Sequence, residues 1–394
     1  MISCVDVFII HTQLTKAFGD STLSFGGKSV IFAGDFAQLP PPGRAASLYS
    51  NNVGVWSRSA KPYAQKCAIG KALWHQFTVV VLLRQNMRQR GMSDEDIRFR
   101  RALENLRYSR CSRDDEALFM TRVCRPDRGD TTHLAPQFRS VSIITARNAH
   151  RDGINSIRVR QFAAEHKLPL FRFHSLDRWG RNKGSVSVRQ AQRHYDRTVD
   201  PVRTTNAITS KLQAVLWEIP PALSQHHAGV LELCKGMPVL LKYNEATELC
   251  ATNGAEAIVH DWISHMNAGR HVLDTLFVEL VSPPRAVQLE GLPPNVIPLT
   301  RTRKSVRCTL PVNDLQVSVS REQVMVLPNF AMTDFASQGR TRIFNVVHPR
   351  FCRNHQSLYT CLSRSASLAG TLMIDSFCPA KIKGGASASL RKEY

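Results

Sequence analysis

The sequence predicts an α/β protein made of more than one domain, and three observations support this class. The chain has 394 residues, more than one compact domain usually holds and suitable for two or three. Hydrophobic residues make up 43% of it, enough to form buried cores. Short apolar runs of strand length alternate with stretches of helical apolar spacing, the pattern of a parallel sheet covered by helices.

The first third of the chain carries this alternation. Residues 5–18 have helical apolar spacing, and Gly26-Gly27 then breaks the chain. Residues 29–33 and 77–83 are short apolar runs that predict buried parallel strands. Residues 94–106 predict a helix, and residues 141–144 predict a third strand.

The pattern changes in the middle of the chain. Residues 175–230 are rich in Arg, Ser, Thr, Gln and His, and we expect an inserted, partly disordered loop there. Residues 237–242, 257–262 and 277–280 predict strands, with a turn at Thr252-Asn253-Gly254, so residues 236–305 are expected to form a small β barrel. From Leu315 the α/β pattern returns, and residues 381–394 are expected to be a flexible basic tail.

The charge indicates the kind of partner. The chain holds 52 Lys and Arg against 31 Asp and Glu, a net charge of +21. Such a chain attracts polyanions, of which nucleic acid is the usual one, although a solvated basic surface without a defined partner is the alternative. Two arginine-rich stretches, residues 84–113 and 178–197, suit a phosphate-tracking groove or a soluble loop equally well.

Other classes of protein fit poorly. None of the ten cysteines forms a C-x-x-C pair, which argues against a zinc site, and we expect no metal ligands. No apolar stretch approaches the roughly 20 residues of a membrane helix, and the N-terminus lacks the pattern of a secretory signal. We therefore expect an intracellular protein without a membrane partner, and a nuclear one if its ligand is DNA.

The segment from Gly34 to Pro41 is the most informative for chemistry. It reads G-D-F-A-Q-L-P-P and follows an apolar run, so Asp35 and Gln38 stand where a strand is expected to end. In open α/β sheets ligands bind at that edge. A Gln there can orient a phosphate oxygen or an attacking water. By itself, an ordinary strand-to-loop turn closed by two prolines explains the segment equally well.

This segment resembles the third motif of the petite-integration-frequency (PIF) type DNA helicases, within the first helicase superfamily. The residues Phe25-Gly26-Gly27 before it are also typical of that family. Further segments resemble later parts of the family in the same order: the fourth motif, the strand opening the second motor domain, the inserted barrel, and the fifth and sixth motifs. These are residues 83–89, 143–155, 236–254, 330–341 and 359–365. The spelling around Phe335-Ala336, where the family usually has His-Lys, is most similar to the helicase part of fungal Helitron transposons.

The resemblance implies a RecA-like helicase fold. Residues 1–80 would be the remainder of a first motor domain. Residues 81–235 and 306–380 would form the second, with an SH3-like barrel inserted at 236–305. It also implies ATP and Mg²⁺ as cofactors, 5′→3′ unwinding in replication, repair, recombination, transposition or telomere maintenance, and single-stranded DNA and duplex junctions as partners. A replication-initiator domain could accompany it in a longer protein.

The resemblance also implies roles for individual residues. Arg88 and Arg364 would stabilise charge on the transferred phosphoryl group, and Gln38 would take part in catalysis. Gly34, Asp35 and Gly339 would lie at the nucleotide. The residues implied at DNA are Asn148, Phe330, Thr333, Ser337 and Gln338. For a single Arg in so basic a chain, a surface charge is the alternative, and for Ser337 it is a helix cap.

Two requirements of such a motor are not met by the sequence. A phosphate-binding loop reads G-x-x-x-x-G-K-[ST], and Gly27-Lys28-Ser29 fails it because Thr22 stands in place of the first glycine. An acidic pair for magnesium, D-E-x-S-M in the family, would lie just before Met1. We therefore expect an N-terminally truncated helicase, and a non-enzymatic nucleic-acid-binding remnant is the alternative. Several aromatic side chains could stack on bases, and none is assigned that role from sequence: Trp217, Tyr243, Trp262 and Phe335.

Overall fold

The protein is described here by a computed structural model. It describes residues 2–43, 45–51, 53, 61–125, 127, 129–132, 135–179, 207–311 and 314–393. The chain divides into two compact units. The first comprises residues 1–146 and 337–394, and the second residues 147–336. This division differs from the expected domain bounds, because residues 1–80 and the last part of the chain fall in one unit.

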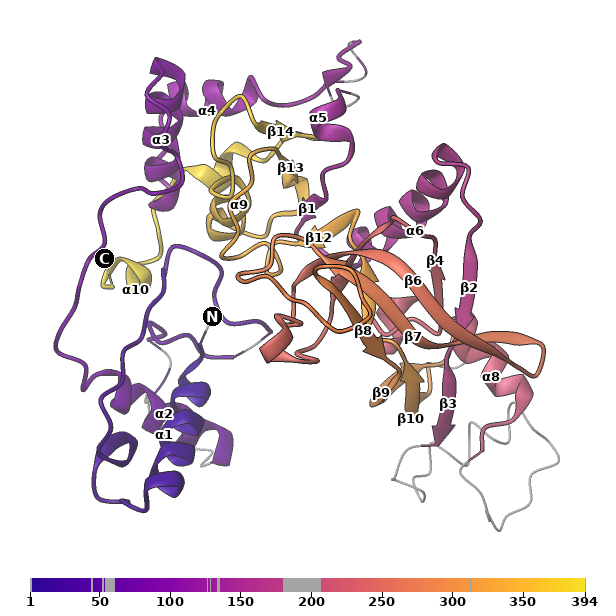
Figure 1. Ribbon diagram of the computed structural model, residues 1–394. Coiled ribbons are helices and arrows are strands. Elements are labelled where there is room, and N and C mark those ends of the chain that lie inside the picture. The colour runs from indigo at the N-terminus through magenta and orange to yellow at the C-terminus, as the bar shows by residue number, and fades with distance from the viewer. Residues whose placement is uncertain are drawn as a thin grey trace. The chain divides into compact units, whose positions relative to one another are not determined.

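The first unit begins with the expected helix, α1 (Cys4–Phe18). Ser3 caps its N-terminus in a capping box with Asp6, and Gly19 ends it in a left-handed conformation. Helix α2 (Pro62–Trp74) packs against α1 (Figure 1). The contact is close at Gly70, where a Cβ atom would lie 1.8 Å from the backbone oxygen of Cys4.

The two strands expected at residues 29–33 and 77–83 do not form. Both segments lack regular secondary structure, and Ile31 is 93% exposed. Val79, Val80, Val81, Leu82 and Leu83 are 83%, 76%, 78%, 63% and 94% exposed. A parallel strand is stable only when neighbouring strands take up its backbone hydrogen bonds and helices cover its faces. No described strand pairs with either segment, and the apolar pattern alone could not reveal this.

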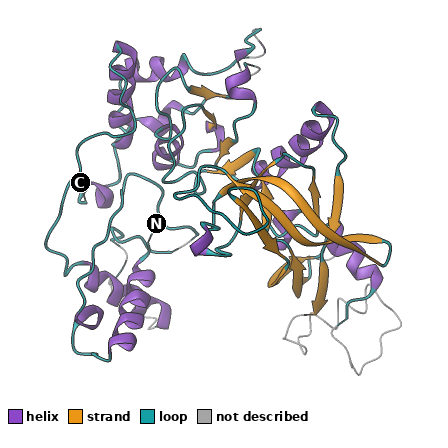
Figure 2. Ribbon diagram, in the orientation of Figure 1, coloured by secondary structure: helices purple, strands orange, loops and turns teal. Residues whose placement is uncertain are grey.

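The α/β pattern appears in the rest of the first unit. Strands β1 (Ile143–Thr145), β13 (Asn345–His348) and β14 (Thr371–Met373) are parallel, with β13 in the middle. Helices α3 (Asp94–Arg107), α4 (Arg113–Met120), the short α5 (Pro136–Arg139) and α9 (His355–Leu362) belong to the same unit (Figure 2). The expected helix at 94–106 and strand at 141–144 are therefore confirmed, the strand being displaced by two residues at its start.

The expected flexible tail at 381–394 is wrong for the part that is described. Residues Pro379–Ile382 form a 3-10 turn (η7) and Ala388–Arg391 a short helix, α10. Ile382 and Leu390 are fully buried, and the amide of Cys111 donates to the Ile382 carbonyl at 3.0 Å. The basic composition predicted a tail, but burial of the two apolar residues Ile382 and Leu390 packs this segment against the rest of the unit.

The second unit is mainly antiparallel β structure. Its larger sheet has the order β11-β5-β6-β7-β8, formed by Val326–Pro328, Pro238–Leu241, Glu256–Asn267, Arg270–Leu280 and Val296–Thr300. Ala268 and Gly269 both have positive φ, as a two-residue hairpin turn between β6 and β7 requires. This sheet takes the place of the expected small barrel and extends beyond its bounds; SH3-like closure stays a prediction.

The expected irregular insertion and the early return of the α/β pattern are both corrected. Strands β3 (Leu176–Trp179), β10 (Gln316–Gln323) and β9 (Thr302–Thr309) form a second sheet, and helix α8 (Ser210–Glu218) packs on its buried face. Strands β2 (Phe171–His174) and β4 (Val230–Leu233) pair beside it. Residues 180–206 of the expected insertion lie outside the described residues. These strands were not predicted because only one face of each is apolar, so polar residues alternate with apolar ones along the sequence.

A fully buried ion pair joins the two strands β3 and β10. The Arg321 guanidinium contacts both carboxylate oxygens of Asp177, at 2.9 and 2.8 Å, and both side chains are 0% exposed. The unit is completed by helix α6 (Asn148–Glu165) and strand β12 (Ala331–Thr333). Asn155 of α6 forms two hydrogen bonds to the backbone of Ala331, at 3.2 and 2.8 Å, and so fixes β12 against the helix.

Candidate nucleotide site

The loop at residues 34–41 presents Asp35 and Gln38. Asp35 folds the loop on itself, because its carboxylate accepts from the amide of Ala37 at 2.9 Å and from the Gln38 side chain at 3.4 Å. Asp35 and Gln38 are half-buried, whereas Gly34 is exposed. The loop therefore forms as a tight turn although the strand expected before it does not.

Helix α9 holds this loop through one buried glutamine. The Gln356 amide nitrogen lies 2.8 Å from the carbonyl of Phe36, 3.0 Å from that of Gln38 and 3.4 Å from the Tyr49 hydroxyl. Gln356 is 5% exposed, so these bonds form away from water. Nothing in the sequence pattern indicated this residue, because two of its three partners are backbone carbonyls and all three lie more than 300 positions away.

Helix α3 neutralises the one carboxylate of the loop. Arg107 pairs with Asp35 at 2.9 Å. Burial opposes the charge of Arg107, but Asp35 and neighbouring tyrosines outweigh it and raise the Arg107 pKa. Burial, followed by the Asp35 charge, raises the pKa of Tyr359 on α9. Asp35 is thus committed to an ion pair, and Arg107 was not predicted from sequence.

A second loop, residues 84–91, carries Arg88. Asn86 organises it by accepting from the amides of Arg88 and Gln89, both at 3.0 Å, and by donating to the Gln89 side chain at 2.8 Å. Arg88 donates to the Thr341 hydroxyl at 3.0 Å and to the Ser363 carbonyl at 2.9 Å. Burial lowers the Arg88 pKa. The expected fourth, fifth and sixth motifs therefore meet at this arginine.

Gln89 braces the turn that follows α9. It is 3% exposed, and its amide nitrogen lies 2.5 Å from the Ser365 carbonyl and 3.4 Å from that of Ser363. From the other side, the amide of Arg342 donates to the Arg364 carbonyl at 2.9 Å. Arg364 therefore sits on a turn fixed from both sides, which limits where its side chain can point.

The Arg364 side chain is buried with part of its hydrogen-bonding capacity unused. It is 1% exposed, and it donates to the Thr360 carbonyl and the Ser363 hydroxyl, both at 2.9 Å. Its Nη1 atom has no hydrogen-bond partner among the described residues. Burial, followed by the nearby Arg88 charge, lowers the Arg364 pKa to about 10. A buried, incompletely satisfied guanidinium is costly, and an anion would relieve that cost.

Arg88 and Arg364 together make the site electropositive. Both contact Ser363, Arg88 through the carbonyl and Arg364 through the hydroxyl. Within the described residues, every hydrogen-bond acceptor that the structure gives these two groups is an uncharged oxygen. Two adjacent cations without a carboxylate partner suit a phosphate ligand, which arginine binds in fixed geometry.

The Gly27-Lys28-Ser29 segment does not form a phosphate cradle. Gly26 and Gly27 lie in a 3-10 turn, η1 (Ser24–Gly27), and among the described residues no helix follows it until α2. The Lys28 ammonium group lies over the Phe18 ring, 4.3 Å from its centroid. In addition, the described residues contain no group of three or more His, Cys, Asp or Glu side chains that could hold a metal ion. The residues present therefore fit the arginine side of a nucleotide site and not its phosphate-loop side.

The residues expected at DNA are divided between the two units. In the first, Ser337 is fully buried, Gln338 is half-buried and Gly339 is exposed with φ +78°. In the second, Asn148 is exposed at the start of α6, whereas Phe330 is 9% exposed and its ring packs against Phe162. The Thr333 hydroxyl accepts from the amide of Ala336 at 3.2 Å. Their DNA roles stay predictions.

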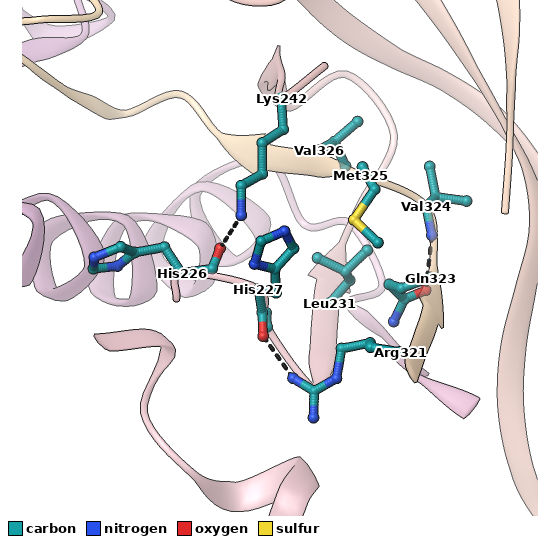
Figure 3. A pocket seen from close by; sticks show the side chains of 10 residues that line it. His226, His227, Leu231, Lys242, Arg321, Gln323, Val324, Met325 and Val326 are labelled. Carbon is teal, nitrogen blue, oxygen red and sulfur yellow. Dashed lines mark hydrogen bonds between the residues drawn. The ribbon is translucent and has the colours of Figure 1, made fainter. Parts of the chain in front are cut away.

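A small cavity in the second unit has no room for a substrate (Figure 3). Its volume is about 10 Å³, close to the space of one water molecule. Lys242 donates to the His226 carbonyl at 2.7 Å beside it, and Arg321 donates to the His227 carbonyl at 2.6 Å. Burial lowers the Lys242 pKa to about 7 and the His227 pKa to about 4. These groups hold loop and strand together rather than forming a reactive centre.

The fold is an α/β arrangement with a parallel sheet and a β-rich insertion. It is similar to Pif1 helicase from Candida albicans, with 17% identity and a TM-score of 0.62 over 100% of this chain and 74% of that one. Two solved structures of Bacteroides Pif1 are also similar, one bound to single-stranded DNA and one in complex with ADP-AlF3 and single-stranded DNA. Each has a TM-score of 0.61 over 100% of this chain and 72% of the other, at 16% and 17% identity.

Comparison by sequence gives a different result. No family model matches the chain, and no curated protein matches it. At such low identity the solved structures establish the fold alone. No helix in the described residues is long and apolar enough to cross a membrane.

Proposed function

We propose that this chain is the arginine-bearing part of an ATP-dependent DNA helicase of PIF type. The observation that carries the proposal is Arg364, a buried guanidinium with an unused donor, placed beside Arg88 on a turn braced by Gln89. ATP would supply the phosphoryl group whose transfer drives such a motor. In this chain Arg88 and Arg364 would bind its terminal phosphate, and Gln38 would orient the attacking water.

The finer assignments belong to the same proposal. They are 5′→3′ polarity, action on single-stranded DNA and duplex junctions, and a role in replication, repair, recombination, transposition or telomere maintenance in the nucleus. Helitron ancestry, Mg²⁺ as the accompanying ion and a replication-initiator domain in a longer protein are also proposals. They rest on the motif spellings described above and on the similarity of fold.

A second candidate is a nucleic-acid-binding protein without ATPase activity. The specific observation in its favour is that Gly27-Lys28-Ser29 forms no phosphate cradle and Lys28 is placed over Phe18. The net charge of +21 suits this function as well as it suits a motor.

One experiment separates the two candidates. The purified chain is titrated with a fluorescent ATP analogue and assayed for ATP hydrolysis with and without single-stranded DNA, alongside Arg364→Met. We expect weak nucleotide binding that Arg364→Met removes, and no hydrolysis by this chain alone. Nucleotide binding that is equal in the two proteins would overturn the assignment of Arg364. DNA binding with no nucleotide binding at all would favour the second candidate.

A further inference from the structure

A second, open pocket lies in the β-rich unit. Its volume is about 340 Å³, at the lower end of small-molecule sites. The floor is apolar and aromatic, and the rim carries one cation and one anion. The residues that line it are Leu168, Pro169, Phe171, Lys235, Asp261 and Trp262.

The main feature of this pocket is Trp262 on strand β6. The ring is half-buried and makes two edge-to-face contacts, to Phe171, which also lines the pocket, at 5.0 Å and to Phe173 at 5.5 Å between centroids. Such contacts fix an aromatic ring in place. Binding to a fixed ring costs little conformational entropy, so Trp262 is suited to stack on a planar ligand.

The strand itself is irregular where it supplies the pocket. The pairing of β6 with β7 shifts between Val259 and Asp261, leaving His260 without a partner in the ladder. Before the shift Val259 faces the core; after it, Asp261 is exposed and Trp262 turns toward the core face. Bulges commonly re-aim side chains beside binding sites. The shift therefore places a carboxylate and an indole next to each other at the pocket.

The rim offers one donor and one acceptor side by side. The Lys235 ammonium group lies 2.9 Å from the Asp261 carboxylate and 5.7 Å from the centroid of the Trp262 ring. The two charged side chains are 55% and 53% exposed, so the ion pair holds them only weakly and can open for a ligand. An aliphatic side chain of a peptide would leave both groups unused, whereas the edge of a nucleobase presents both acceptors and amine donors.

We propose that this pocket binds a nucleobase of single-stranded DNA, stacked on Trp262 with Lys235 and Asp261 at its edge. Asp261 would accept from an exocyclic amine, which cytosine has and thymine lacks. The proposal depends on the proposed function only for its choice of DNA as the polymer, a choice that the net charge of +21 also favours. Binding of a base at this pocket does not require ATP to be bound at Arg88 and Arg364.

The test is binding of end-labelled oligo(dC) and oligo(dT) of equal length to the full chain, without nucleotide and at constant salt. We expect Trp262→Leu to weaken binding of oligo(dC) about tenfold, the effect typical of losing one stacked base. Trp217→Leu is the matched control: Trp217 is also half-buried in this unit, but it is hydrogen-bonded to Ser175 and is not among the residues that line this pocket. We expect the control to bind as the parent does, and both variants to keep the parent's circular dichroism spectrum.

The remaining outcomes are equally decisive. The parent should prefer oligo(dC) to oligo(dT), and Asp261→Asn should reduce that preference. If Trp262→Leu binds both oligonucleotides as the parent does, the pocket is not a base site, although DNA binding by the protein stands. If Trp262→Leu instead loses binding of a proline-rich peptide, the pocket is a peptide site and the inference is wrong. If the parent binds no single-stranded DNA at low salt, the inference and the DNA partner of the proposed function both fail.

Discussion

Replacing Arg364 with methionine should make the protein more stable while removing its affinity for nucleotide. Burial and the Arg88 charge lower the Arg364 pKa from its ordinary value to about 10, which corresponds to about 3 kcal/mol of unfavourable free energy for the charged side chain. Methionine fills a similar volume without that charge. The substitution loses two hydrogen bonds, to Thr360 and Ser363, each worth about 1 kcal/mol. The expected net gain is therefore about 1 kcal/mol.

The assay is equilibrium unfolding in urea, followed by tryptophan fluorescence and circular dichroism, with nucleotide titration in parallel. The matched control is Arg107→Met, the same change at a half-buried arginine that does have a carboxylate partner, Asp35. It should destabilise, because it leaves Asp35 unpaired. If Arg364→Met lowers the free energy of unfolding as Arg107→Met does, Arg364 is a structural residue and the reasoning that assigns it to an anion is wrong.

Three further predictions concern stability. Breaking the buried pair by Asp177→Asn should cost about 3–5 kcal/mol in urea unfolding, and adding Arg321→Met should recover much of it; equal costs for the single and double variants would contradict this. The low pKa values of His227 and Lys242 mean that the unfolded chain binds more protons, so stability should rise from about pH 4 to 6.5 and again above about pH 7. In a pH series of melting temperatures, Lys242→Met should remove the alkaline rise. It should also weaken the acid rise, because the Lys242 charge helps burial to lower the His227 pKa. Gly70→Ala should lower the melting temperature strongly, because its Cβ would meet the α1 backbone; an unchanged value would show that α1 and α2 pack differently.

Local sequence signals predicted the elements that form through local interactions. Helices α1 and α3 both have helical apolar spacing, so both were found with nearly correct bounds. The hairpin strands β6 and β7 were found in part, since their alternation is clear near the core and is lost toward the hairpin tip. In contrast, residues 29–33 and 77–83 have the composition of strands but do not form them. Strand formation there would require neighbouring strands to pair with, and composition does not reveal whether these are present.

The candidate site was predicted to the extent that motifs mark it. Arg88 and Arg364 were expected to act together, and both contact Ser363. Gln356 and Arg107 were missed because their partners are distant in sequence and, for Gln356, include backbone carbonyls, which carry no side-chain signal. Trp262 was noted among several aromatics, but its pocket depends on a strand irregularity that no composition reveals.

The bare aliphatic segment from Val79 to Leu83 has a consequence in the cell. Five consecutive exposed β-branched or leucine side chains without a charge are what chaperones bind on incompletely folded chains and what joins such chains into aggregates. Chaperones would therefore bind this protein as they bind an incompletely folded chain, even when its second unit is fully folded. Its abundance would be limited by how quickly another surface covers that segment, so its lifetime in the cell would depend on assembly more than on the strength of its own cores.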